Sequence, residues 1–349
     1  MDAVLTAMVE EKIGPGERNR LLIQTAKEHL MFDYALALRS PAVALHLALK
    51  ALAVRSGQAV VISALSPRYY FQVIEDLQLT PLFCDVSYDF PCISRETVEK
   101  AMADKPIGLE ICAVILHHTL GFLPDTASIA ELGFPVIEDI SHSYGSRIKS
   151  AGKKDESAGV EDKYPKEKED AQTKISGVFC ILGLEERDVL TSGGGALLFA
   201  MNRRDGSLLR NFAAIPDEYC LPDINAALAV VQFREAQRNI EKRRDIARVY
   251  TQASLRTRHK RFIPLVEDEY NNYSFSLVLE TGLKDVIAYA RKKEIIVESA
   301  FENTIAGAGM SGNCTVSNSL SLRTVLFPIY PRLRSQEAER VSRLIMTLP

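Results

Sequence analysis

The sequence of 349 residues is long enough for two domains, and its 47% hydrophobic and 25% charged residues are typical of a globular protein. A net charge of −3 excludes a general electrostatic affinity for nucleic acid or an anionic membrane surface. No segment reaches the ~20 apolar residues of a membrane-spanning helix, and the acidic N-terminus lacks the features of a signal peptide. The six cysteines include no CxxC pair, which favours free thiols. We therefore expect a cytoplasmic protein.

Helical and strand patterns alternate over the first 140 residues. Helices are expected at 16–30, 41–52, 69–77, 94–103 and 126–132, and strands at 32–38, 59–65, 81–86, 112–118 and 134–140. This alternation predicts βαβ units and a mostly parallel sheet, and hence an α/β fold. Ligands of such sheets bind beyond the carboxyl ends of the strands, so Asp85, His118 and Asp139 are expected at one cleft.

The charged segment 149–174 interrupts the alternation. It contains almost no apolar residues, so we expect a mobile surface insertion. Two further strands are expected at 176–184 and 196–200, with the glycine-rich turn 191–195 between them. The sheet pattern therefore continues after the insertion.

The periodicity of residues 223–254 predicts one long helix, or two with a bend. This helix is expected to join a large domain, residues 1–235, to a small C-terminal α+β domain, residues 236–349. The small domain is predicted to contain strands 273–280 and 295–299, helices 283–293 and from residue 335, and an irregular stretch at 304–321.

Several segments resemble, in order and spacing, those of one enzyme family. PVIEDISHSYGS at 135–146 is similar to the PVIEDAAQAHGA segment of the DegT/StrS (DegT/DnrJ/EryC/StrS) sugar aminotransferases. Further similar segments are SPAVALHLAL at 40–49, PLFCDV at 81–86, HTLGFLPD at 118–125, LPDINAALAVVQF at 221–233, EKRRDIARVY at 241–250 and FPIYPRL at 327–333. The resemblance implies a fold-type I aminotransferase fold, pyridoxal phosphate as cofactor, nucleotide-sugar metabolism and a homodimer.

The family's chemistry needs a lysine that binds the cofactor and a carboxylate that pairs with its ring nitrogen. The resemblance places Asp139 at the carboxylate position, although Asp139 could also simply end its strand. The lysine position falls on Glu185, or on Glu186 if the gap is shifted. A glutamate cannot form the Schiff base, so covalent cofactor binding is not expected.

The other cofactor contacts that the resemblance implies are also altered. Pro41 removes an amide donor and Ala42 a hydroxyl from the phosphate site, of which Ser40 remains. A glutamine beside the ring is replaced by His142. A serine is replaced by Cys180, an asparagine by Glu218, an arginine by Cys220, and a stacking aromatic residue by Pro67, for which Tyr69 or Tyr70 could partly substitute. The predicted vestigial pocket therefore comprises Asp139, His142, Ser40, Cys180 and Tyr69.

Three functional hypotheses follow. The first is a homologue that has lost transamination, without a cofactor, and binds a sugar nucleotide or a partner protein as a pseudoenzyme. The second is an active aminotransferase or dehydratase that holds pyridoxal or pyridoxamine phosphate noncovalently, with His142 as base. The third needs Lys174 or Lys242 to replace the missing lysine, although Lys174 precedes its strand at the wrong end. No metal site is expected, because His117 and His118 beside Asp125 do not form a zinc-ligand pattern.

Overall fold

The computed structural model describes residues 2–11, 13–146, 175–264, 270–280 and 282–349. Its large part is built on seven strands: β1 (Tyr34–Leu38), β2 (Ala59–Ser63), β3 (Thr80–Cys84), β4 (Ile111–His117), β5 (Val136–Asp139), β6 (Phe179–Gly183) and β7 (Ala196–Ala200). They form one sheet in the order β1-β7-β6-β5-β4-β2-β3. Strands β3, β2, β4, β5 and β6 pair in parallel, and only β7 runs antiparallel to its neighbours. The prediction of a mostly parallel sheet is confirmed, whereas the predicted insertion lies outside the described residues.

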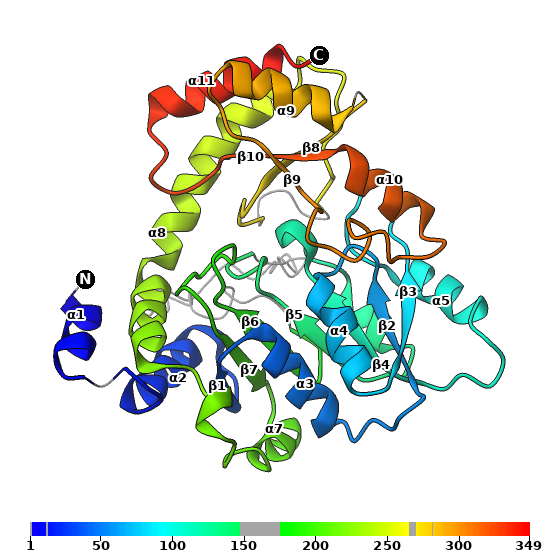
Figure 1. The fold of residues 1–349 in the computed structure, drawn as a ribbon, viewed down its shortest axis with the longest axis vertical. Helices are drawn as coiled ribbons and strands as arrows, with labels where there is room; N and C mark the ends of the chain where they lie inside the picture. The colour runs from blue at the N-terminus through cyan, green and yellow to red at the C-terminus, as the bar shows by residue number, and fades with distance from the viewer. Residues whose placement is uncertain (1, 12, 147–174, 265–269, 281) are drawn as a thin grey trace, which may run out of the picture.

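Helices cover both faces of this sheet (Figure 1). Side chains of α3 (Pro41–Ala51), α4 (Arg68–Asp76) and α7 (Arg203–Arg210) pack on one face. The other face is covered by α2 (Glu17–Leu30), α5 (Arg95–Ala103), α6 (Thr126–Ala130) and the start of α8 (Asp223–Ser254). The short helix α1 (Asp2–Val9) and the 3-10 turns Thr119–Gly121 and Asp217–Tyr219 complete the large part. Among the described helices, none combines the length and hydrophobicity that crossing a bilayer requires.

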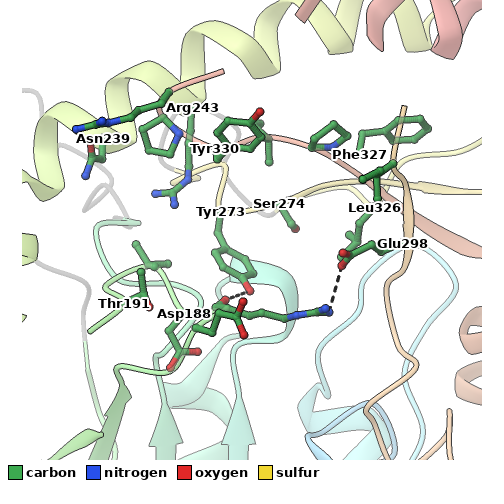
Figure 2. A pocket seen from close by; sticks show the side chains of 18 of the residues that line it. Asp188, Thr191, Asn239, Arg243, Tyr273, Ser274, Glu298, Leu326, Phe327 and Tyr330 are labelled. Carbon is green, nitrogen blue, oxygen red and sulfur yellow. Dashed lines mark hydrogen bonds and ion pairs between the residues drawn. The ribbon is translucent and has the colours of Figure 1, made fainter. Parts of the chain in front are cut away.

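The C-terminal part is a three-stranded antiparallel sheet with helices. Its elements are β8 (Phe275–Val278), α9 (Leu283–Lys292), β9 (Glu298–Ser299), α10 (Thr315–Arg323), β10 (Thr324–Phe327) and α11 (Ser335–Met346), and the strand order is β8-β10-β9. Helix α8 has 32 residues, or about 48 Å, and runs from the large part to α11 (Figure 1). Residue 235, the expected domain boundary, lies within it. Between the two parts, α8, Tyr273, Phe327 and Asp188 line a cavity (Figure 2).

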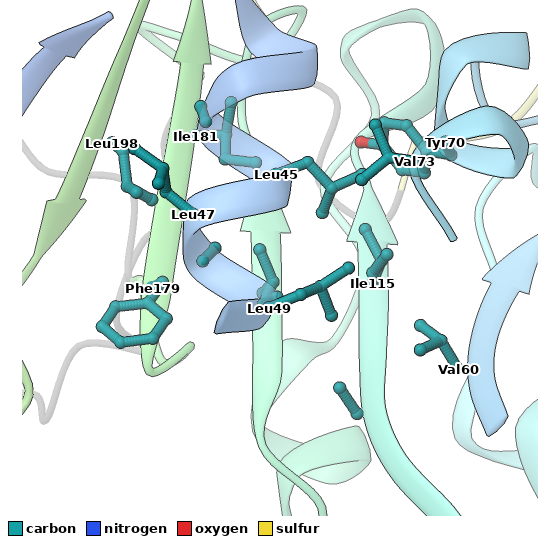
Figure 3. Close-up of a cluster of buried hydrophobic side chains, with 14 of the residues drawn as sticks. Leu45, Leu47, Leu49, Val60, Tyr70, Val73, Ile115, Phe179, Ile181 and Leu198 are labelled. Atoms are coloured by element: carbon teal, nitrogen blue, oxygen red, sulfur yellow. The ribbon is translucent and has the colours of Figure 1, made fainter. Parts of the chain in front are cut away.

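Local sequence explains why α3 begins where it does. Ser40 has an extended backbone, and its hydroxyl accepts a hydrogen bond from the Val43 amide at 3.3 Å. Pro41 occupies the first turn, where its missing N–H costs nothing. Leu45 and Leu49 then recur at helical spacing and are fully buried against the sheet (Figure 3). The start of α3 is thereby held at the carboxyl edge of the sheet.

Strand residues contribute alternately to the two faces. Val60 and Ile62 of β2 belong to the cluster under α3 and α4, whereas Ala59 and Val61 belong to the opposite cluster. Every residue of β2 is buried, as expected for a parallel strand covered on both sides. The sheet therefore cannot offer a face for ligands, and only its edges and strand ends remain available.

The expected irregular stretch at 304–321 was wrong over its last third, where α10 forms. Its sequence is rich in serine and has no local capping residue. The residue directly after β3 supplies the missing cap. The Asp85 carboxylate accepts hydrogen bonds from the Val316 amide at 2.9 Å and the Ser317 amide at 2.8 Å. Asp85, which we expected to face the cleft, is therefore a remote N-cap. The sequence analysis also missed α7 and β10.

A Leu49→Ala substitution is expected to destabilise the protein by about 2–5 kcal/mol, because it leaves a cavity in a closed core. Urea denaturation followed by circular dichroism measures this change. Leu322→Ala is the control, since Leu322 is 73% exposed and its truncation should cost less than about 0.5 kcal/mol. Equal effects of the two substitutions would contradict the packing described for α3.

Candidate active site

A cavity of about 350 Å³ lies at the carboxyl ends of β4, β5 and β6. Its wall includes Tyr69 from α4, His117, Asp139 and His142 from the strand ends, and the residues after β6 from Glu185 to Asp188. Parallel strands bring these side chains together, as expected for a crevice at the carboxyl edge of an open sheet. Three of the predicted pocket residues, Asp139, His142 and Tyr69, therefore meet here.

The Asp139 carboxylate is buried and accepts hydrogen bonds on both oxygens. Oδ1 accepts from the Ser141 amide at 3.0 Å and from the Ser141 hydroxyl. Oδ2 accepts from the Tyr70 hydroxyl at 2.5 Å and from the Tyr69 hydroxyl at 3.2 Å. A carboxylate offers about four lone-pair positions, and here the protein's own donors occupy four.

Opposing effects set the pKa of Asp139. Burial raises it, but His117 and the hydrogen bonds from Ser141 and Tyr70 lower it more, and the net pKa lies below its ordinary value. Asp139 therefore stays ionised. The same burial and the Asp139 charge raise the pKa of Tyr69 and Tyr70 well above the ordinary range, so both hydroxyls remain donors.

Two histidines beside Asp139 are neutral at physiological pH. Burial lowers the pKa of His117 to about 4 and that of His142 to about 3, with His117 adding to the effect on His142. The His142 ring stacks on Tyr273 at a centroid distance of 4.4 Å, and its Nδ1 is buried without a partner among the described residues. His117 bonds to the Thr119 hydroxyl at 3.1 Å. One ring face of His142 is thus already covered.

The buried pair His118 and Glu138 is internal. Glu138 accepts from the Ser176 amide at 2.7 Å, the Gly177 amide and the Thr126 hydroxyl at 3.1 Å, and it lies 3.3 Å from His118. His118 bonds through its other nitrogen to Ser143 at 2.7 Å. These contacts tie β5 to its neighbours, so neither side chain reaches the cavity. His118, like Asp85, therefore does not serve the cleft as we expected.

The segment after β6 places carboxyl groups where the resemblance expects a lysine. The Asp188 carboxylate accepts from the Glu185 amide at 2.8 Å, and Glu185 in turn reaches the Gly195 amide at 3.4 Å. Gly183 allows this fold-back, because a Cβ there would lie 2.3 Å from the Asp188 carboxylate. Glu185, Glu186 and Asp188 all line the cavity.

Asp188 is the site residue that the sequence analysis missed. Burial, opposed by the Glu185 amide and reinforced by the charges of Asp139 and Glu185, raises the pKa of Asp188 to about 8. Its other oxygen lies 3.7 Å from Nε2 of His142. Asp188 is therefore a protonated acid at neutral pH, next to a neutral imidazole. In the sequence it is one acid in a charged run, and only burial distinguishes it.

Two predicted pocket residues lie elsewhere. Cys180 is fully buried in the core beneath α2 and α8, and burial raises the pKa of its thiol well above normal. Ser40 caps α3, and only its neighbour Pro41 lines the cavity. Glu218 and Cys220 lie near the end of β1, where the Glu218 carbonyl accepts from Arg39 at 2.8 Å. Among the described residues, no group of three or more His, Cys, Asp or Glu side chains could hold a metal ion.

The cavity does not fit covalently bound pyridoxal phosphate. Its described lining contains no lysine, and its cations are Arg68 and Arg187. Four carboxyl groups, those of Asp139, Glu185, Glu186 and Asp188, face the same space. The start of α3 lacks the Pro41 amide, and the Val43 amide already bonds to Ser40. The described lining thus supplies no lysine for the aldehyde, and the start of α3 offers fewer amide donors for the phosphate.

A second cavity of about 680 Å³ adjoins the first and shares Glu186, Arg187 and Asp188 with it. Tyr273 lies between them: its ring stacks on His142, its hydroxyl donates to the Arg187 carbonyl, and it lines the larger cavity (Figure 2). Arg187 also forms an ion pair with Glu298 at 3.2 Å. We refer to these two adjoining cavities together as the cleft between the two parts of the chain.

Comparison with known proteins identifies relatives that match most of the chain. The model of the DegT/DnrJ/EryC1/StrS aminotransferase family matches residues 1–160 and 204–346. EpsN of Bacillus subtilis, by its name a pyridoxal phosphate-dependent aminotransferase, is 25% identical over 294 residues, which are 76% of this chain and 68% of EpsN. The matched ranges omit residues 161–203, the segment that carries β6, Glu185 and Asp188.

Solved structures share the fold. A DegT/DnrJ/EryC1/StrS aminotransferase from Brucella abortus superposes with a TM-score of 0.82 at 20% identity, covering 99% of this chain and 93% of its own. The sugar aminotransferase Spr1654 from Streptococcus pneumoniae, in its PLP-form, gives 0.82 at 16% identity, with 99% and 94% coverage. The expected fold-type I aminotransferase architecture is confirmed by these superpositions.

An Asp188→Asn substitution is expected to change how stability depends on pH. Between about pH 5 and pH 8 the folded chain keeps a proton on Asp188 that the unfolded chain has released, so this group lowers the unfolding free energy as pH rises, by roughly 3 kcal/mol. Asparagine removes that contribution and still accepts from the Glu185 amide. The variant should therefore gain stability relative to the parent as pH approaches 8.

Urea denaturation at about pH 5 and pH 8 measures the difference between parent and variant. Asp245→Asn is the control, because the Asp245 side chain is 71% exposed and should leave the pH dependence unchanged. Parallel pH profiles for the parent and Asp188→Asn would show that Asp188 is ionised in the folded protein.

Proposed function

The chain belongs to the DegT/DnrJ/EryC1/StrS aminotransferase family, and we propose that it has lost the covalent cofactor chemistry of that family. The observation that carries this proposal is the state of Asp139. In the resemblance this carboxylate pairs with the cofactor's ring nitrogen, but here Ser141, Tyr69 and Tyr70 take all of its acceptor positions. A ring nitrogen could bond to Asp139 only by displacing one of these donors. Asp139 has become part of the protein's internal structure.

The charge of the cavity supports the same proposal. A phosphate ester carries close to two negative charges at neutral pH, and bringing it beside ionised carboxylates in a buried site is unfavourable. Asp139 and Glu185 line the cavity together, and Glu185 stands where the resemblance expects the lysine. Since Asp188 is protonated at neutral pH, it adds no charge but offers no amine either. Although Arg68 and Arg187 also line the cavity, its described lining has no amine to bond the cofactor's aldehyde.

The noncovalent alternative depends on His142 as base, and the geometry of His142 disfavours it. With a pKa of about 3, the imidazole is unprotonated at neutral pH but holds an abstracted proton poorly. Its face is covered by Tyr273 instead of a cofactor ring. Lys242, the described lysine of the third hypothesis, is absent from the lining of the cavity, and Lys174 lies outside the described residues.

The remaining role that we propose is ligand or partner binding in nucleotide-sugar or polysaccharide metabolism, as a pseudoenzyme. Two features support it: a cavity of about 680 Å³ lies between the two parts, and the family match covers residues 1–160 and 204–346. The name of Spr1654, a sugar aminotransferase, points to sugar chemistry for this fold. We propose a homodimer as well, and the exposed apolar side chains Leu5, Met8, Val9 and Ile13 near the N-terminus are available for such an interface.

Incubation with pyridoxal phosphate followed by borohydride tests the loss of covalent chemistry. We expect no stoichiometric, site-specific adduct by peptide mass spectrometry and no transamination of nucleotide-linked keto sugars. A Glu185→Lys substitution should not restore transamination, because the protein's own donors still occupy Asp139 and the Pro41 and Val43 amides still cannot bind a phosphate. Glu186→Lys is tested in parallel, because the lysine position of the family falls on Glu186 if the alignment gap is shifted by one residue.

A single reducible lysine adduct in the parent would overturn the proposal. Transamination by Glu185→Lys alone would show that the remaining site still accepts the cofactor. Spectroscopic titration separates the alternative: pyridoxal phosphate that binds without a reducible adduct would favour noncovalent chemistry.

Sedimentation equilibrium tests the proposed homodimer. The parent should sediment at twice the mass of the 349-residue chain. A Val9→Glu substitution should weaken the dimer if the N-terminal apolar side chains form the interface, since Val9 is 82% exposed in the single chain. A monomeric parent at micromolar concentration would contradict the proposal.

A further inference from the structure

The larger cavity contains a half-buried cation, Arg243, that has no counter-charge among the described residues. Arg243 projects from α8 into the cavity of about 680 Å³, on the same wall as Asn239 (Figure 2). Its Nε and Nη1 atoms are buried and have no hydrogen-bond partner among the described residues. Burial lowers the pKa of Arg243 from its ordinary value, with Tyr273 opposing the effect, and the guanidinium nonetheless stays charged. Burying two guanidinium nitrogens without hydrogen-bond partners is costly, so their retention calls for a partner.

The other charges of the cavity do not supply that partner. Glu298 is already paired with Arg187 at 3.2 Å. Asp188 carries a proton at neutral pH, since burial raises its pKa to about 8. Glu186 is exposed, and no ion pair joins it to Arg243 within the described residues. Within the part of the chain that the structure describes, the positive charge of Arg243 on the α8 wall thus has no ion-pair partner.

The shape of the cavity indicates what kind of anion fits. A volume of about 680 Å³ is in the range of sites for organic molecules, far larger than a bare ion needs. Tyr273, Tyr330 and Phe327 provide flat apolar surface, and Asn239 and Ser274 provide hydrogen-bonding groups. A guanidinium matches the oxygens of a carboxylate or phosphate through two parallel hydrogen bonds.

We propose that Arg243 binds the oxyanion of a small organic ligand, a phosphate monoester or a carboxylate, whose ring or carbon body lies against Tyr273 and Tyr330. The site lies outside the cavity in which the cofactor of the family would sit. This proposal depends on the proposed function in one respect: both assume that the cleft between the two parts binds a ligand. Arg243 is then a binding residue with no part in folding, retained at some expense in stability.

Isothermal titration with phenyl phosphate and with benzoate tests the site, because the two probes share a ring and differ in the oxyanion. The parent should bind one or both, and Arg243→Gln should weaken that binding at least tenfold. Arg238→Gln is the matched control: Arg238 lies on the same helix, its side chain is 68% exposed, and it pairs with Glu235 at 3.2 Å. This control should bind the probes like the parent.

Thermal denaturation supplies a readout that a structural role would not give. Arg243→Gln should melt at the same temperature as the parent or higher, and the bound probe should raise the melting temperature of the parent but not of this variant. The preferred probe assigns the oxyanion. No binding of either probe, unchanged affinity in Arg243→Gln, or a fall of several degrees in its melting temperature would each overturn the proposal. Such a failure would leave the assay of pyridoxal phosphate at Glu185 unaffected, so the two proposals can fail separately.

Discussion

The hydrogen bonding of Asp139 is the constraint on which the site depends. One carboxylate at the end of β5 binds the amide and hydroxyl of Ser141 and two hydroxyls from α4. The Ser141 hydroxyl also accepts from the Gly183 amide at 2.7 Å, so the same group reaches β6. Three elements thus converge on one buried charge. In the described structure this charge accepts hydrogen bonds from the protein's own donors.

Sequence reasoning worked best where local pattern and burial agree. The strands and helices around the sheet follow from apolar periodicity, and the helix expected at 41–52 is observed as α3. It worked least well in the C-terminal part, because α10 has weak helix-forming residues and takes its cap from Asp85, more than 200 positions away. A local pattern cannot show a partner that distant.

For the site as well, some residues were predicted from the sequence and others were not. Asp139, His142 and Tyr69 were predicted to lie together from the resemblance, and they do. Cys180 was placed at the cofactor by alignment alone, but strand alternation turns its side chain into the core. Asp188 and Arg243 were missed because burial distinguishes them from the other charged residues of the chain. The sequence alone does not show which charged side chains are buried.

The cap that Asp85 gives to α10 also connects the large part of the chain to the C-terminal part. A carboxylate on the large sheet holds three donors of the C-terminal part, the amides of Val316 and Ser317 and the Ser317 hydroxyl at 2.6 Å. These hydrogen bonds connect the two parts at the β3 edge of the sheet. The long helix α8 connects them on the opposite side (Figure 1). The two parts are thus connected at two separate places. Substitutions of cavity residues leave the Asp85 contacts intact, because Asp85, Val316 and Ser317 line neither of the two cavities.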